Sequence, residues 1–149
     1  MASKGPTAIH DITPVDIDIR GFNAFAVSIG SISARFERAG FAYDLLSHCR
    51  FLSRLQKIDG QRGGAWKLLT MEVIYIYDSI IPAFPQRGQN LLTIENMPNT
   101  TRRSYKYLSW LLMEQGHEVD AHMPGIDNEE SVKEIMDRNY SWLNSWMAK

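Results

Sequence analysis

Residues 41–82 read FAYDLLSHCRFLSRLQKIDGQRGGAWKLLTMEVIYIYDSIIP, and this stretch decides the fold that we predict from the sequence. In its first part apolar residues recur at steps of three and four, which is typical of one face of a helix. They are Phe41, Leu45, Cys49, Leu52 and Leu55. Glycines at 60, 63 and 64 predict a turn. A second helix is expected from Trp66, with apolar residues on nearly all sides, and Pro82 ends it.

We therefore expect an α+β fold in which a small sheet from the N-terminal half packs on a central helical hairpin. An amphipathic helix follows at the C-terminus. The chain has 149 residues, of which 44% are hydrophobic, and this favours one domain with a substantial core. We divide it into an extended N-terminal arm, residues 1–20, and a single globular α+β domain, residues 21–149.

The sheet is predicted from alternating apolar residues. Residues 15–20 alternate between apolar and charged, which is typical of a short edge strand with one solvated face. Residues 22–36 form the clearest strand, but their apolar positions change from odd to even at Gly30-Ser31. A β-bulge in one bent strand is the favoured explanation, so that Val27 and Ala34 both face the core. A hairpin that turns at Gly30-Ser31 is the alternative.

Two helices are expected in the C-terminal part. Residues 102–115 fit a helix or a strand, and helix is favoured because Gly116 can cap its end. A final helix is expected to open at Asp127, which stands in capping-box spacing to Glu130. Core packing is the favoured interpretation of Trp142 and Trp146, and an interface is the alternative. The candidate self-association residues are Trp142, Trp146, Glu129 and Glu130.

The charges are divided along the chain, although the formal net charge is only −1. Residues 35–67 hold seven basic and three acidic residues, a balance of +4, and residues 114–149 hold three basic and eight acidic, a balance of −5. The candidate sites for binding an anionic surface are Arg50, Arg54, Lys57, Arg62 and Lys67. Such clusters can bind lipid headgroups or nucleic-acid phosphates. A merely solvated face is the alternative, and head-to-tail association of the two charged parts is a further one.

An enzyme is the minority interpretation. No nucleophile elbow, phosphate-binding loop or dinucleotide fingerprint is present. His117 and His122 are five residues apart, whereas a zinc protease helix needs a spacing of four, so a polar loop is favoured over a metal site. Cys49 lies among apolar residues and is expected to be a buried structural thiol. We expect no cofactor, metal, small-molecule substrate, signal peptide or membrane span.

Several segments, taken in order, resemble the matrix proteins of rhabdoviruses over roughly residues 22–82. They are the strand Phe25-x-Val27-x-Ile29, the segment 43–48, the Gly/Arg turn, and the opening Trp66-Lys67-Leu68-Leu69. Pro6, Thr7 and Ala8 match three of the four residues of the Pro-Thr-Ala-Pro budding motif, and Ile9 replaces its last proline.

The resemblance implies a non-enzymatic structural protein of the cytoplasm and the virion. It would form homo-oligomers beneath a membrane, bind the anionic inner face, and contact the viral nucleoprotein. A small cytosolic adaptor that binds a protein partner through its acidic C-terminal helix is the alternative function. A small enzyme with a site at His117 and His122 is the third.

Overall fold

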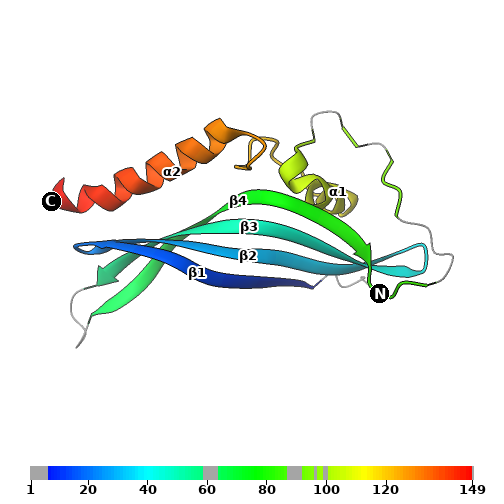
Figure 1. The fold of residues 1–149 in the computed structure, drawn as a ribbon, viewed down its shortest axis with the longest axis horizontal. Helices are drawn as coiled ribbons and strands as arrows, with labels where there is room; N and C mark the ends of the chain where they lie inside the picture. Colours follow the sequence, from blue (N-terminus) through cyan, green and yellow to red (C-terminus); the bar gives the residue numbers. More distant parts are fainter. Residues whose placement is uncertain (1–6, 59–63, 87–91, 96, 99–100, 149) are drawn as a thin grey trace.

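Four long antiparallel strands dominate the computed structural model, which describes residues 7–58, 64–86, 92–95, 97–98 and 101–148 (Figure 1). They are β1 (Ala8–Arg20), β2 (Asn23–Arg38), β3 (Phe41–Ile58) and β4 (Ala65–Pro82), and they pair in the order β1-β2-β3-β4. Within the described ranges two α-helices follow, each joined to a short 3-10 helix. They are η1 (Arg103–Tyr105), α1 (Lys106–Glu114), α2 (Glu129–Asn144) and η2 (Ser145–Ala148).

The expected central helical hairpin is wrong, because residues 41–82 form the strand hairpin β3–β4. The spacing of three and four has another cause. From Tyr43 to Phe51 the buried residues of β3 occupy odd positions, and Leu52 on the opposite side is also fully buried. A strand whose buried side changes midway places apolar residues at uneven steps that imitate a helix. The protein is therefore a sheet with attached helices.

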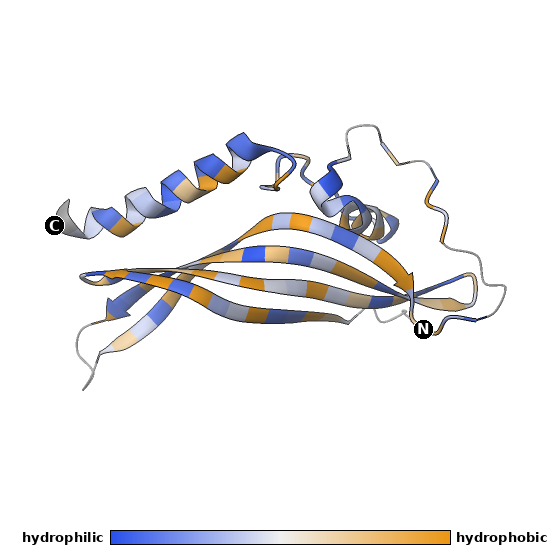
Figure 2. Ribbon diagram, in the orientation of Figure 1, coloured by the Kyte–Doolittle hydropathy of each residue, from blue (hydrophilic) through white to orange (hydrophobic). Residues whose placement is uncertain are grey.

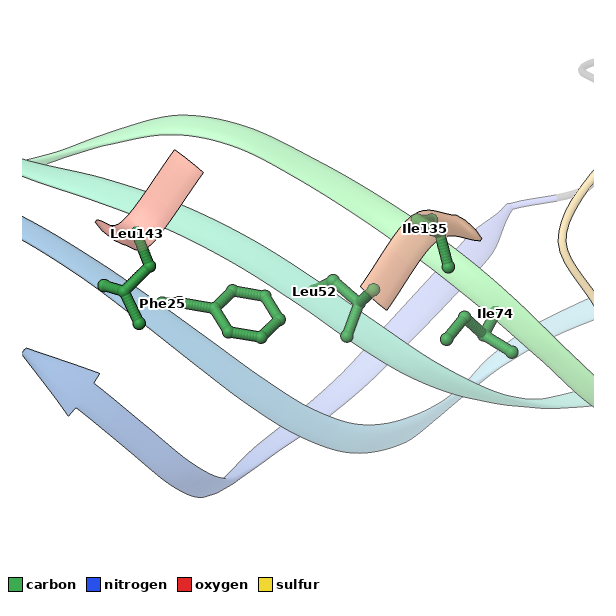
Figure 3. Packing of buried hydrophobic residues seen from close by; sticks show 5 residues of the cluster. All are labelled: Phe25, Leu52, Ile74, Ile135 and Leu143. Carbon is green, nitrogen blue, oxygen red and sulfur yellow. The ribbon is translucent and has the colours of Figure 1, made fainter. Parts of the chain in front are cut away.

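The change of buried side arises because α1 and α2 cover opposite faces of the sheet. Trp110 and Leu111 of α1 pack on Ala34 and Leu45. On the other face, α2 packs on strand residues at the other end of the sheet (Figure 3). That core cluster consists of Phe25, Leu52, Ile74, Ile135 and Leu143. Successive strand residues point to opposite faces, so Leu45 and Leu52, seven positions apart, cannot share one. We name the two sides the α1 face and the α2 face.

The same arrangement explains the phase change in β2. This strand is continuous and pairs with both neighbours without a register shift at Gly30, so neither the expected bulge there nor the hairpin exists. Val27 packs with the α2 cluster and Ala34 with the α1 cluster. Both residues are in a core, but in two different ones. Glycine is needed at position 30 because the backbone of β1 comes very close there. A Cβ at this position would lie 1.8 Å from the backbone oxygen of Asp11.

The two outer strands have different surroundings. β1 is an edge strand, as expected, but it begins at Ala8, so most of the predicted N-terminal arm belongs to the sheet. The edge of β4 is joined by the segment before α2: Tyr75 donates its N–H to the oxygen of Pro124 (2.9 Å), and Ile126 donates to the oxygen of Tyr75 (3.0 Å). Through this segment the chain passes from the α1 face to the α2 face.

Both C-terminal helices are confirmed. Residues 102–115 contain η1 and α1, and Gly116 follows with φ of +82°, a conformation that glycine adopts readily. The cap of α2 is Asn128 rather than Asp127, because Asn128 Oδ1 accepts the N–H of Ser131 (3.1 Å). Figure 2 shows apolar residues gathered on one side of α2 and mixed with polar ones along the strands. None of the described helices is both long and apolar enough to cross a bilayer.

Candidate functional site

Two rows of side chains cross all four strands on the α1 face, at the end of the sheet away from α1. One row is Ile19, Ala24, Leu55 and Leu68, and the other is Ile17, Ala26, Ser53 and Met71. The large outer residues are strongly exposed: Ile17 by 56%, Ile19 by 58%, Leu68 by 57% and Met71 by 48%. Neither row contains a charged side chain. We name these two rows the bare surface.

From Asp16 to Arg20, the charged side chains of β1 lie on the face that α2 covers, and the apolar side chains lie on the opposite face. This is the reverse of the arrangement expected for a single chain. Asp16, Asp18 and Arg20 lie on the α2 face, where Arg20 Nη1 donates to Oδ1 of Asn144 in α2 (2.8 Å). The isoleucines at 17 and 19 point to the opposite face, where none of the described helices covers them. A half-exposed antiparallel sheet normally places its apolar side against the covering element. Contiguous exposed apolar residues of this kind mark interaction surfaces.

The sheet edges are less suited to association than this face. Within β1 the pairing shifts between Pro14 and Asp16, and Pro14 has no N–H to offer to another strand. Irregular, proline-containing edges of this kind oppose edge-to-edge pairing. On β4 the segment 124–126 already occupies part of the edge. The bare surface is therefore the strongest candidate for a functional interface.

The predicted anion-binding residues do not lie on one helical face. By strand alternation Arg50 and Arg54 point to the α2 face and Lys57 to the α1 face. Arg54 is engaged by α2, because its Nε donates to Oδ1 of Asn139 (2.7 Å). Lys67 pairs with Gln56 and shares the α2 face, and Arg62 lies outside the described residues. Binding of an anionic surface by these residues stays a prediction.

The predicted self-association residues occupy the two ends of α2. Glu129 and Glu130 stand in its first turn, where carboxylates favour the helix dipole. Trp142 packs at the edge of the α2 cluster, and Trp146 lies against Gly21. About 25 Å of helix separates the acidic pair from Trp146, so the four residues do not form one patch. Self-association through them also stays a prediction.

The other predicted sites are peripheral. Ala8 opens β1 directly after Thr7, and Pro6 lies outside the described residues. His122 is an exposed loop residue whose Nδ1 lies 3.2 Å from Oδ1 of Asp120. It lines a cleft of about 410 Å³ with Tyr75 and Glu72, whereas His117 does not. The part of the chain that is described contains no group of three or more His, Cys, Asp or Glu that could hold a metal.

Trp66 corrects another expectation. A helix with apolar residues on nearly all sides would be buried and would place the ring of Trp66 in the core, but the residue is 39% exposed on the strand β4. Its removal should therefore cost much less than the 3–5 kcal/mol of a fully buried aromatic residue. Cys49, in contrast, is buried as expected, and burial raises the pKa of its thiol.

Two partly buried acids were not identified as site residues from the sequence, and both have partners within the chain. Asp127 binds the start of η1: its Oδ2 accepts from Nε of Arg102 (3.0 Å) and its Oδ1 from Oγ of Ser104 (2.6 Å). These donors hold the pKa of Asp127 well below its usual range. Asp78 Oδ2 accepts the N–H of Leu108 (2.7 Å) in the first turn of α1, while its Oδ1 is buried and has no hydrogen-bond partner among the described residues. Burial raises the pKa of Asp78 to about 6.

Asp78 is expected to make the free energy of unfolding depend on pH. Its pKa is higher in the folded than in the unfolded protein, so its stabilising contribution is complete below about pH 4 and is lost as the pH rises through about 6. Asp78→Asn keeps an oxygen for Leu108 but carries no charge. With allowance for solvent screening, the variant should gain about 1–2 kcal/mol relative to the parent between pH 5 and pH 8. Urea unfolding at both pH values measures this difference, and a difference independent of pH would contradict it.

No family model matches the chain. The chain is similar to Pea pathogenicity protein 2 of the fungus Fusarium vanettenii, with 30% identity over 125 residues. This match covers 82% of the chain and 51% of that protein, so the chain spans about half the length of the curated relative it matches.

The resemblance to rhabdovirus matrix proteins is wrong. Its segments at 43–48 and 66–69, taken as helix, are strand, and the similar protein is fungal.

Proposed function

We propose that this chain is a non-enzymatic structural subunit that functions as a homodimer, with the bare surface as its interface. The observation that supports the proposal most strongly is the reversed polarity of β1. Its isoleucines at 17 and 19 are more than half exposed, while its charged residues lie on the side of α2. Burial of these isoleucines in a dimer would recover the hydrophobic free energy that the single chain leaves unused.

A second copy of the chain suits this surface better than a charged partner. Because the two rows contain no charge, one copy can meet another without like-charge repulsion. Ala24 and Ala26 on the inner strand β2 are already buried in the single chain, so the exposed outer residues Ile17, Ile19, Leu68 and Met71 would make the contact. In a twofold dimer the same patch is used by both copies. The exposed isoleucines of β1 and the exposed Leu68 and Met71 of β4 would then be buried in both copies.

Two variants of β4 test the proposal. Leu68 and Ile81 are similarly exposed, by 57% and 54%, but strand pairing places them on opposite faces of the sheet. In sedimentation equilibrium the parent should have twice the 17.1 kDa mass of the chain. Leu68→Asp should be a monomer, because two aspartates would face each other in the dimer, and Ile81→Asp should remain a dimer.

Ile19→Asp, in the same row as Leu68 but on β1, should also be a monomer, and circular dichroism checks that each variant is folded. A monomeric parent would overturn the proposal. So would dissociation of Ile81→Asp, or a Leu68→Asp variant that stays dimeric.

A further inference from the structure

A cleft of about 470 Å³ lies where the end of α2 meets the turn between β1 and β2. Its walls include Phe22, Asn23, Gln56, Lys57, Trp142 and Trp146. This volume falls within the roughly 300–1,000 Å³ of typical small-molecule sites. None of the bare-surface residues lines the cleft. We name it the aromatic cleft.

The aromatic walls are fixed by contacts within the chain. Gly21 has φ of +58°, and a Cβ at this position would lie 2.4 Å from the ring of Trp146, so only glycine lets the tryptophan lie so close to the turn. Nδ2 of Asn23 donates to the backbone oxygen of Trp142 (3.1 Å), which connects β2 with the end of α2. Phe22 is 50% exposed beside them. A preformed site of this kind loses little conformational entropy when a ligand binds.

The polar part of the cleft is cationic. Lys57 is the one charged residue among its lining residues, and no carboxylate lines it. Within the described part of the chain, Lys57 Nζ has no ion pair. The neighbouring Arg54 is not available, because its Nε binds Asn139 and its guanidinium lies 5.5 Å from the ring centre of Trp142. By strand alternation the side chain of Lys57 starts on the α1 face, and a Cβ at Gly64 would lie 3.4 Å from its Nζ. Its long side chain borders the cleft from this side, and with no ion pair among the described residues to hold it, the ammonium can turn to an anion there.

We propose that the aromatic cleft binds a small planar aromatic anion, of the class of aromatic carboxylates. The ring of the ligand would pack against Phe22 and Trp146, and its carboxylate would accept hydrogen bonds from the ammonium of Lys57. Aromatic packing and a charge-assisted hydrogen bond are both directional, so together they select a flat ligand with an acidic group. This site gives Lys57 and Trp146 a role beyond the proposed dimer interface.

The test uses three probes with one ring system and different charge: 2-naphthoate, 2-naphthalenemethanol and 2-naphthylmethylamine. Calorimetric titration of the full chain should show that naphthoate binds more tightly than the alcohol and that the amine binds weakest. Lys57→Gln should lower the affinity for naphthoate about ten-fold and leave the affinity for the alcohol unchanged, because only the charged contact is lost. Phe22→Ala should lower the affinity for naphthoate and for the alcohol, each about five-fold.

Two matched variants serve as controls. Lys133→Gln removes an exposed cation from α2, and Phe84→Ala removes a phenylalanine that is 64% exposed and lies near Arg35. Neither should change the affinity for naphthoate. The proposal is overturned if naphthoate binds no more tightly than the amine, or if Lys57→Gln matches the parent. Equal effects of Phe22→Ala and Phe84→Ala would also overturn it, because binding would then not depend on the cleft.

Discussion

Replacement of Asp127 by alanine is expected to lower the free energy of unfolding by about 3–5 kcal/mol, the usual cost of removing one partner of a buried ion pair. The side chains of Asp127 and Arg102 are only 11% and 17% exposed. Asp127 also accepts hydrogen bonds from Oγ of Ser104 and the N–H of Arg103 (2.9 Å). The variant leaves the guanidinium buried without its counter-charge, and it separates the start of η1 from the segment that precedes α2.

Urea denaturation at pH 7 measures this loss. The pKa of Asp127 is lower in the folded than in the unfolded protein, so its contribution is complete at neutral pH and is lost only as the pH falls through the folded-state value. The matched control is Asp137→Ala, since Asp137 pairs with Lys133 on the exposed side of α2 and both side chains are more than 60% exposed. That change should cost less than about 1 kcal/mol. Equal losses for the two variants would contradict a stabilising role of the Asp127–Arg102 ion pair.

Replacement of Leu52 by alanine is expected to cost about 2–5 kcal/mol, from lost transfer free energy and the cavity that remains. Leu52 is fully buried between Phe25 and Ile74, and it packs beneath α2. Leu69→Ala is the control, because Leu69 lies on β4 and is 48% exposed. Thermal or urea unfolding of both variants gives the comparison. A loss below about 1 kcal/mol for Leu52 would mean that α2 does not pack on this face of β3.

The sequence predicted the helices better than the sheet, for a physical reason. The segments 102–115 and 129–144 have ordinary helical signals, such as Gly116 after the first and a capping residue before the second. β3, in contrast, is built from leucine, serine, arginine and glutamine, which favour helices or are neutral, and tertiary packing overrides this preference. The signal that could have corrected the prediction is Val73-Ile74-Tyr75-Ile76-Tyr77 in β4, because β-branched and aromatic residues favour strands.

The candidate surfaces could be predicted only in part. The alternation of residues 15–20 was visible in the sequence, and it correctly indicated an edge strand. It could not show which face of the sheet the isoleucines occupy, because this depends on where α2 packs more than a hundred residues later. The same holds for the aromatic cleft, where Phe22, Lys57 and Trp146 come from three distant segments.

The most direct test of the dimer is a distance measurement between two copies. A nitroxide label at Leu68→Cys reports on the bare surface, and one at Ile81→Cys reports on the opposite face of the same strand. Cys49 can remain, because it is buried. Sheets that pack face to face lie about 10 Å apart, so the labels at position 68 should show strong dipolar broadening and those at 81 should not. Absence of broadening at 68, or equal broadening at both positions, would contradict association through the bare surface.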